Sequence, residues 1–167
     1  MTAPSATPEP TPDSAPDRSP GHRSEPAASA YAGDLTPQHA WELLASDERA
    51  VLVDVRTDAE WRYVGVPDTS PIGRPTAFIE WVRYPSGQPN PGFLDGLIAA
   101  GLAPGDNRPV VFLCRSGVRS VAAATAATAA GLGPAYNVLH GFEGDVDPAG
   151  HRGAQGWRAA GLPWTQP

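Results

Sequence analysis

Two short runs of mostly apolar residues constrain the fold of this chain more than any other feature. VLVDV spans Val51 to Val55, and PVVFLC spans Pro109 to Cys114. Runs of this length without polar alternation are typical of strands buried on both faces, as in parallel sheets. Each run is followed by a predicted helix. We therefore expect an α/β fold in which a parallel sheet carries helices on both faces.

Signals for the other elements surround these two runs. Thr36 and Pro37 provide an N-cap and a first helical position, and apolar residues follow at helical spacing. The segment 64–91 is rich in proline and is predicted to be mostly connection. The remaining predicted elements are helices over Asp58 to Tyr63, Phe93 to Ala100 and Val118 to Ala130, a third strand over Asn137 to Leu139, and a short strand or turn within Ala77 to Val82.

The first thirty residues differ in composition from the rest of the chain. They hold seven of the 20 prolines and no Val, Ile, Leu, Phe, Trp or Tyr. Because such a segment has almost no apolar surface to bury, we expect residues 1–30 to be a disordered tail and residues 31–167 to form one domain. The tail lacks the apolar core of a secretory signal, and the longest nearly apolar run, Val121 to Leu132, is too short to span a bilayer. The expected location is the cytoplasm, with no membrane partner.

The charge balance and the cysteine count exclude several classes of function. The 12 basic residues are all arginine and stand against 18 acidic residues, so the net charge is −6. Such a chain lacks the basic surface that binding to a nucleic-acid backbone requires, so no nucleic-acid partner is expected. The one cysteine, Cys114, excludes an internal disulfide and a cysteine-rich zinc site. The histidines lack metal-ligand spacing, and no cofactor is expected.

The single cysteine stands where parallel sheets bind their ligands. Cys114 ends a predicted buried strand, and the next residues turn into the helix that begins at Val118. The loop amides, the positive end of that helix and the side chains of Arg115 and Arg119 all favour a thiolate here. Gly117 lets the turn curl without a Cβ clash. Cys114 is therefore the predicted nucleophile, and a buried, inert cysteine is the alternative.

The sequence resembles the rhodanese-like sulfurtransferase family in three segments, LVDVRTDAEW (Leu52 to Trp61), the loop CRSGVR and GWRAAGLPW (Gly156 to Trp164). The resemblance covers about residues 32 to 164 and implies a five-stranded parallel sheet flanked by helices. It implies that Cys114 takes a sulfane sulfur from an anionic donor such as thiosulfate. A persulfide on Cys114 then passes the sulfur to cyanide or a thiol, a protein thiol included. The implied substrate-binding residues, whose amides form an anion cradle, are Arg115, Ser116, Gly117, Val118, Arg119 and Ser120.

Two other functions are weighed against this one. Phosphatases that resemble this fold place one more residue between cysteine and arginine than the four that separate Cys114 from Arg119. The shorter ring fits a sulfur atom better than a phosphoryl group, so a phosphatase ranks last. The main alternative is a non-catalytic module that binds a partner or senses oxidation through Cys114. With one cysteine in the chain, an acceptor from outside must discharge any persulfide.

The chain departs from the family pattern in two places. Gly65 to Ser70 differs from the turn that precedes the third strand, which leaves the position of that strand open. Fifteen residues, Phe142 to Gly156, separate Gly141 from Trp157, where family members have a few. Because this insert leaves the carboxyl end of a strand, we expect it to border the mouth of the active site; a surface loop without that role is the alternative.

Several other side chains near the predicted site are open to two interpretations. Asp54 and Arg56 share a face of their strand and are predicted to form an internal ion pair, with Glu60 as a candidate third member; a catalytic role is the alternative. Phe78, Trp81 and Tyr84 are candidates for lining the approach to Cys114, with packing in the core or on the surface as the alternative.

Overall fold

A five-stranded parallel sheet forms the centre of the molecule. The computed structural model describes residues 29–167, so the predicted tail, residues 1–30, lies outside the described residues except for its last two. The strand order is β1-β6-β5-β2-β4, and every neighbouring pair is parallel. The strands are Gly33–Leu35 (β1), Val51–Asp54 (β2), Thr76–Phe78 (β4), Val110–Leu113 (β5) and Ala135–Val138 (β6). The predicted α/β class and the five-stranded parallel sheet are confirmed.

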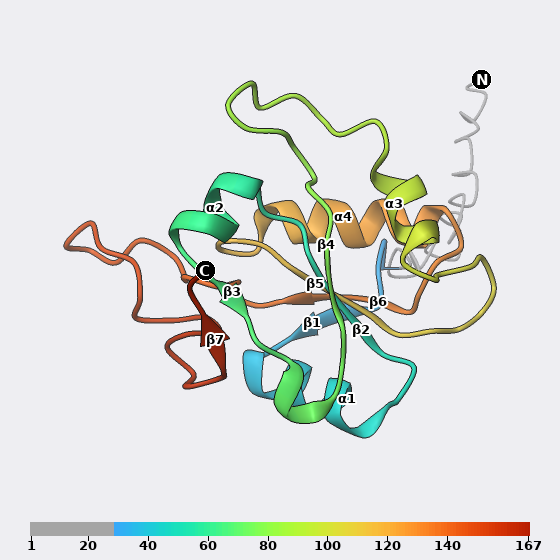
Figure 1. The fold of residues 1–167 in the computed structure, drawn as a ribbon, viewed down its shortest axis with the longest axis horizontal. Helices are drawn as coiled ribbons and strands as arrows, with labels where there is room; N and C mark the ends of the chain where they lie inside the picture. The colour runs from blue at the N-terminus through green and yellow to red at the C-terminus, as the bar shows by residue number, and fades with distance from the viewer. Residues whose placement is uncertain (1–28) are drawn as a thin grey trace, which may run out of the picture.

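Helices cover both faces of the sheet (Figure 1). One face packs against α3 and α4, and the other packs against α1. The helices are α1 (Pro37–Ser46), α2 (Asp58–Tyr63), α3 (Phe93–Ala99) and α4 (Val118–Ala129), with a 3-10 turn η1 (Ser70–Ile72) and a two-stranded antiparallel ribbon of β3 (Val66–Pro67) and β7 (Trp164–Thr165). Within residues 29–167, no helix has the length and apolar character needed to cross a membrane.

Strand β5 shows why the sequence of a central strand is continuously apolar. Val110 and Phe112 pack toward α3 and α4, whereas Val111 and Leu113 pack on the opposite face near α1. All four side chains are fully buried, as expected for a strand covered on both faces. The alternation places the next residue, Cys114, on the side of α4.

Helix α4 lies close against the sheet because its inner face is made of small residues. Ala123, Ala124 and Ala127 are fully buried, and Ser120 completes the buried face one turn earlier. The small side chains bring the backbone of α4 near β5 and β6. The first turn of α4 is thereby held close to the residue that follows β5.

The short strands differ most from the prediction. β6 begins at Ala135, two residues before the predicted strand, and β4 lies at the start of the predicted Ala77 to Val82 segment. The strands β1, β3 and β7 were not predicted. β1 contains Gly33 and Asp34, which strands disfavour, and it forms because it can pair with the buried strand β6.

Candidate active site

The end of β5 and the start of α4 hold Cys114 at the centre of the sheet's carboxyl edge. β5 ends at Leu113, and only Arg115, Ser116 and Gly117 separate Cys114 from the first residue of α4. Gly117 has φ +111°, a conformation that side-chain-bearing residues rarely adopt. A Cβ at Gly117 would meet no atom closer than 3.8 Å, so the backbone conformation, rather than lack of space, requires glycine.

Two groups of the loop donate toward the sulfur of Cys114. The backbone N–H of Gly117 and the hydroxyl of Ser120 each lie 3.1 Å from Sγ. Cys114 is 1% exposed and belongs to the core cluster on the α4 side, so its sulfur is surrounded by protein rather than by water. Such donors at a helix N-terminus favour a negatively charged sulfur.

The other amides of the predicted cradle remain available to a ligand. Among the described residues 29–167, no protein acceptor receives the backbone N–H groups of Arg115, Ser116, Val118, Arg119 or Ser120. Three of these groups belong to the first turn of α4, which has no partners inside its own helix. The loop can therefore donate several hydrogen bonds to an anionic sulfur species.

A chain of buried polar groups continues from Ser120 across the sheet. The Ser120 hydroxyl lies 2.6 Å from Oδ1 of Asn137, and Nδ2 of Asn137 donates to Asp34 at 2.9 Å. Because Asp34 accepts from Nδ2, Asn137 presents its oxygen to Ser120. The Ser120 hydroxyl has one proton, so it donates either to Asn137 or to the sulfur of Cys114. Asn137 and the sulfur of Cys114 therefore compete for the same hydroxyl proton.

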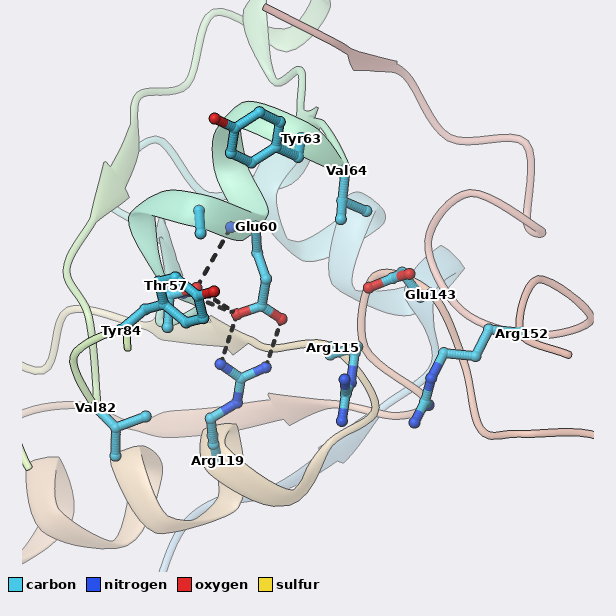
Figure 2. A pocket seen from close by; sticks show the side chains of 11 residues that line it. Thr57, Glu60, Tyr63, Val64, Val82, Tyr84, Arg115, Arg119, Glu143 and Arg152 are labelled. Carbon is cyan, nitrogen blue, oxygen red and sulfur yellow. Dashed lines mark hydrogen bonds and ion pairs between the residues drawn. The ribbon is translucent and has the colours of Figure 1, made fainter. Parts of the chain in front are cut away.

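The guanidinium of Arg119 is paired with the carboxylate of Glu60. Its two terminal nitrogens donate to the two oxygens of Glu60 at 2.8 and 2.7 Å (Figure 2). Glu60 also accepts from the backbone and the hydroxyl of Thr57, both at 2.9 Å, in a capping box that begins α2. The predicted grouping of Glu60 with Asp54 and Arg56 is therefore wrong, because Glu60 turns toward α4.

The Glu60–Arg119 pair is ionised at neutral pH. Burial by itself would raise the pKa of Glu60, but hydrogen bonds from Arg119 and Thr57 bring this pKa down to about 2. The hydrogen bond to Glu60 in turn raises the pKa of Arg119 above its usual range. Arg119 thus contributes a charge that Glu60 balances, together with a fixed position for the first turn of α4.

Asp54 and Arg56 form the internal ion pair that the sequence predicts. Their side chains are fully buried and approach to 2.7 Å. Arg56 also donates to the carbonyl oxygen of Gly65 at 2.8 Å, and its guanidinium lies 4.1 Å from the centre of the Phe142 ring. The pair therefore ties the end of β2 to the turn before β3 and to the start of the insert.

A pocket of about 590 Å³ opens beside the Cys114 loop (Figure 2). Its wall combines the loop, helix α2, the connection after β4 and the insert. Cys114 is not part of the wall, whereas its loop neighbours Arg115 and Arg119 are. The lining residues are Thr57, Ala59, Glu60, Tyr63, Val64, Val82, Tyr84, Arg115, Arg119, Glu143 and Arg152.

The insert lies where the sequence predicts it, at the mouth of this pocket. Glu143 and Arg152 belong to the pocket wall, so the insert borders this pocket. The backbone N–H groups of Phe142 and Glu143 donate to the carbonyl oxygens of Cys114 and Arg115 at 2.8 and 3.0 Å. The insert and the Cys114 loop are therefore joined through their backbones.

Gly141 makes this close approach possible. Its φ is +57°, and a Cβ there would lie 2.6 Å from the carbonyl carbon of Arg115 and closer still to the carbonyl oxygen of Cys114. Trp157 at the end of the insert donates its backbone N–H to Gly141 at 2.8 Å. The insert is thus a closed loop whose two ends meet beside the cysteine.

The aromatic candidates divide between the two interpretations. Tyr84 lines the pocket beside the Cys114 loop. Trp81 packs on Phe93 with ring centres 4.9 Å apart, and Phe78 packs on Trp61 at 5.3 Å. Of the three residues, therefore, only Tyr84 lines this pocket.

Several lining residues were missed by sequence reasoning. Tyr63 and Val64 come from the end of α2, a helix that the sequence placed but whose neighbours it did not identify. A capping-box pattern, Thr57 followed by Glu60, was present as a signal that Glu60 lies near the start of α2. Asn137 and Asp34 were also missed, since neither stands near Cys114 in the sequence.

In the part of the chain described, no cluster of three or more His, Cys, Asp or Glu side chains suits a metal ion.

Comparison with known proteins places this arrangement in one family. The pattern of the rhodanese-like domain matches residues 36–146. Rv0390 from M. tuberculosis, known from a crystal structure, is 58% identical in sequence; the match covers 82% of this chain and 99% of that one, with a TM-score of 0.75. The uncharacterized protein RC0915 of Rickettsia conorii is 35% identical over 125 residues, which are 75% of this chain and 90% of that protein.

A more distant structure shares the fold. The 30 kDa polysulfide-sulfur transferase homodimer from Wolinella succinogenes is 24% identical; the match covers 83% of this chain and 82% of that chain, with a TM-score of 0.56. The family pattern spans most of the described residues, from the N-cap of α1 into the insert. The chain belongs to the family of rhodanese-like domains.

Proposed function

We propose that this chain is a sulfurtransferase that carries sulfane sulfur as a persulfide on Cys114. The observation that carries the proposal is the position of Sγ, 3.1 Å from both the Gly117 amide and the Ser120 hydroxyl at the start of α4. These donors stabilise a thiolate before the reaction and a persulfide anion after it. A cysteine kept only for packing would not need donors aimed at its sulfur.

The first step takes sulfur from an anionic donor of the thiosulfate type. The Cys114 thiolate attacks the outer sulfur of thiosulfate, a sulfur–sulfur bond forms at Cys114, and the donor's own sulfur–sulfur bond breaks. Sulfite leaves with the electron pair of that bond, so no oxidant or reductant is needed. The amides of Arg115 to Ser120 and the positive charge of Arg115 hold the donor and the terminal sulfur.

The second step passes the sulfur to an acceptor from outside the protein. Cyanide attacks the terminal sulfur of the persulfide and leaves as thiocyanate, which restores the Cys114 thiolate. A thiol acceptor, on a small molecule or on another protein, would leave as a persulfide in the same way. The chain has one cysteine, so no second thiol of its own can resolve the persulfide. We expect this chemistry to take place in the cytoplasm, where thiols are kept reduced.

The test is turnover with thiosulfate and cyanide, measured as thiocyanate release. We expect the purified chain to form thiocyanate catalytically and Cys114→Ser to form none. The exposed Arg83, outside the pocket wall, provides the matched control Arg83→Gln, which is expected to retain full activity. Turnover by Cys114→Ser, or none by the unaltered chain with any sulfane donor, would overturn the proposal. In the second case a binding module becomes the better account.

A further inference from the structure

An exposed carboxylate on the edge strand β1 is connected to the sulfur of Cys114 through two buried side chains. We propose that this carboxylate, Asp34, is a positioning residue that favours the sulfur-loaded state of Cys114. It does so by fixing the amide of Asn137, which competes with the sulfur for the hydroxyl of Ser120. The inference rests on the proposed sulfurtransferase function and assigns to that reaction a residue on a strand separated from β5 by β6.

Strand pairing places Asp34 directly beside Asn137. The two residues are register partners in the parallel pair of β1 and β6, so their side chains stand on the same face of the sheet. Nδ2 of Asn137 donates to Oδ1 of Asp34 at 2.9 Å, and the hydroxyl of Tyr31 donates to the same oxygen at 2.9 Å. Asn137 is 3% exposed and Ser120 is fully buried, so protein groups rather than water decide how the amide is oriented.

The charge of Asp34 determines which end of the Asn137 amide faces Ser120. A carboxylate has acceptors and no proton to donate, so the amide turns its NH₂ group to Asp34 and its oxygen to Ser120. The reverse orientation would bring two oxygen acceptors together without a proton between them. The Ser120 hydroxyl lies 2.6 Å from the amide oxygen and 3.1 Å from Sγ, and its one proton can serve only one of the two. Asp34 thereby keeps the competing acceptor in place.

The competing acceptor affects the thiolate and the persulfide of Cys114 differently. In the thiolate the negative charge lies on Sγ, which is then a strong acceptor for the Ser120 hydroxyl. In the persulfide the charge lies on the terminal sulfur, and Sγ accepts only weakly, as a thioether does. The hydroxyl therefore has to leave Asn137 to stabilise the thiolate, whereas it keeps its bond to Asn137 in the persulfide. By fixing the amide, Asp34 stabilises the loaded state relative to the free thiolate.

The substitution Asp34→Asn removes this restraint and keeps the shape of the side chain. The new amide can donate to the oxygen of Asn137, so Asn137 is free to turn its NH₂ group to Ser120. The Ser120 hydroxyl then accepts from Asn137 and donates to Sγ, and the thiolate is formed without the loss of a hydrogen bond. The missing charge by itself has little effect on the balance, because the thiolate and the persulfide each carry one negative charge.

The experiment measures the equilibrium in which the Cys114 thiolate and thiosulfate form the persulfide and sulfite. The thiolate takes the outer sulfur of thiosulfate, and sulfite leaves with the electron pair of the broken bond, so the reaction balances in both directions. The loaded fraction is read by intact mass at fixed ratios of thiosulfate to sulfite, in alkaline buffer so that the unloaded cysteine is a thiolate. We expect Asp34→Asn to lower the equilibrium constant for loading about fivefold, the effect of one hydrogen bond.

Two further variants accompany this measurement. Asp34→Ala also frees the amide of Asn137 and is expected to lower the constant by a similar factor. The matched control is Asp95→Asn, which removes an exposed carboxylate from α3 and should leave the constant unchanged. Circular dichroism establishes that each variant folds, and because an equilibrium is measured, a variant that reacts slowly needs only a longer incubation.

A Ser120→Ala background separates an effect through the hydroxyl from one through charge or fold. In this background Asp34→Asn should leave the loading equilibrium unchanged, because no hydroxyl remains to be restrained. A loading constant that is the same with and without the Asp34 carboxylate would overturn this inference and leave the sulfurtransferase proposal standing. An equal change with and without the Ser120 hydroxyl would do the same. An unaltered protein that no sulfane donor can load would overturn both.

Discussion

The carboxylate of Glu60 and the guanidinium of Arg119 join α2 to α4 through two hydrogen bonds, although the residues stand 59 positions apart in the chain. The pair closes one side of the Cys114 loop and balances one of the two arginine charges that belong to it. Glu60 therefore has opposite effects on stability and on donor binding. It stabilises the fold, and it lowers the positive potential that an anionic donor meets.

Replacing Glu60 by Gln should separate these two effects. Gln can still accept from Thr57 in the capping box, but it cannot balance Arg119. We expect the free energy of unfolding to fall by about 1.5–3 kcal/mol, the range for a hydrogen bond to a charged group. The KM for thiosulfate should fall about threefold because a nearby negative charge is gone.

The matched control for this substitution is Asp58→Asn. Asp58 lies on the same helix and is paired with Arg62 at 3.0 Å, but both side chains are largely exposed. Urea unfolding and thiosulfate kinetics should both be close to those of the unaltered protein. A folded Glu60→Gln protein with a higher KM for thiosulfate would show that Glu60 assists donor binding instead.

The stability of the protein should depend on acid through Glu60. The pKa of this carboxyl is about 2 in the folded chain, compared with 4.5 for an unperturbed group. Because the folded state holds the lower pKa, the stabilisation is complete above pH 4.5 and is lost as the pH falls from 4.5 toward 2. The difference in unfolding free energy between the unaltered protein and Glu60→Gln should shrink over this window. Glu42→Gln, at an exposed position on α1, serves as control, and a difference that grows with acid would contradict the assignment.

The hydroxyl of Ser120 should govern the reactivity of Cys114. Removing it in Ser120→Ala takes away one of the two donors to Sγ, so alkylation by iodoacetamide at neutral pH should slow about tenfold. In Asn137→Ala the hydroxyl loses its competing acceptor and can donate to the sulfur throughout. Alkylation of Asn137→Ala should therefore be as fast as in the unaltered protein or faster, with circular dichroism to establish that both variants fold. Equal slowing of alkylation in the two variants would show that Asn137 and the sulfur do not compete for the Ser120 proton.

Gly117 should be required for its backbone conformation. With φ at +111°, an alanine at this position is strained by about 1–3 kcal/mol, and relief of the strain would move the amide away from Sγ. We expect Gly117→Ala to lose stability and also most of its sulfur uptake from thiosulfate. Gly73→Ala is the comparison, because Gly73 has φ +63° with open space around it and lies outside the pocket wall. That variant should lose stability but keep its sulfur uptake.

The sequence predicts those parts of the fold that leave a local pattern. β2 and β5 are buried on both faces and therefore appear as continuous apolar runs. α2 begins with a capping box and was predicted with its observed bounds. β3 and β7 have two residues each and form only because they meet each other, so no local pattern predicts them. β1 is specified in the same way by its pairing with β6.

In the candidate site, too, the sequence predicts what is local and misses what depends on distant residues. Cys114 and its loop are contiguous, so their relation to β5 and α4 follows from the sequence. The place of the insert follows from the rule that ligands bind at the carboxyl edge of a parallel sheet, and Glu143 and Arg152 bear it out. The partner of Arg119 does not follow, because it depends on how α2 is turned relative to α4. The acidic residues Asp145 and Asp147 also lie on the insert but do not line the pocket. Asp147 accepts hydrogen bonds from within the insert, whereas Asp145 bonds to the ring of His140, just before it.

Intact mass spectrometry after incubation with thiosulfate tests most directly whether Cys114 carries sulfane sulfur. The chain has one cysteine, so a gain in mass identifies the carrier without further mapping. We expect the unaltered protein to gain the mass of one sulfur atom, which cyanide then removes, and Cys114→Ser to gain none. An unaltered protein that gains no sulfur from thiosulfate or from an organic persulfide would contradict the proposed function.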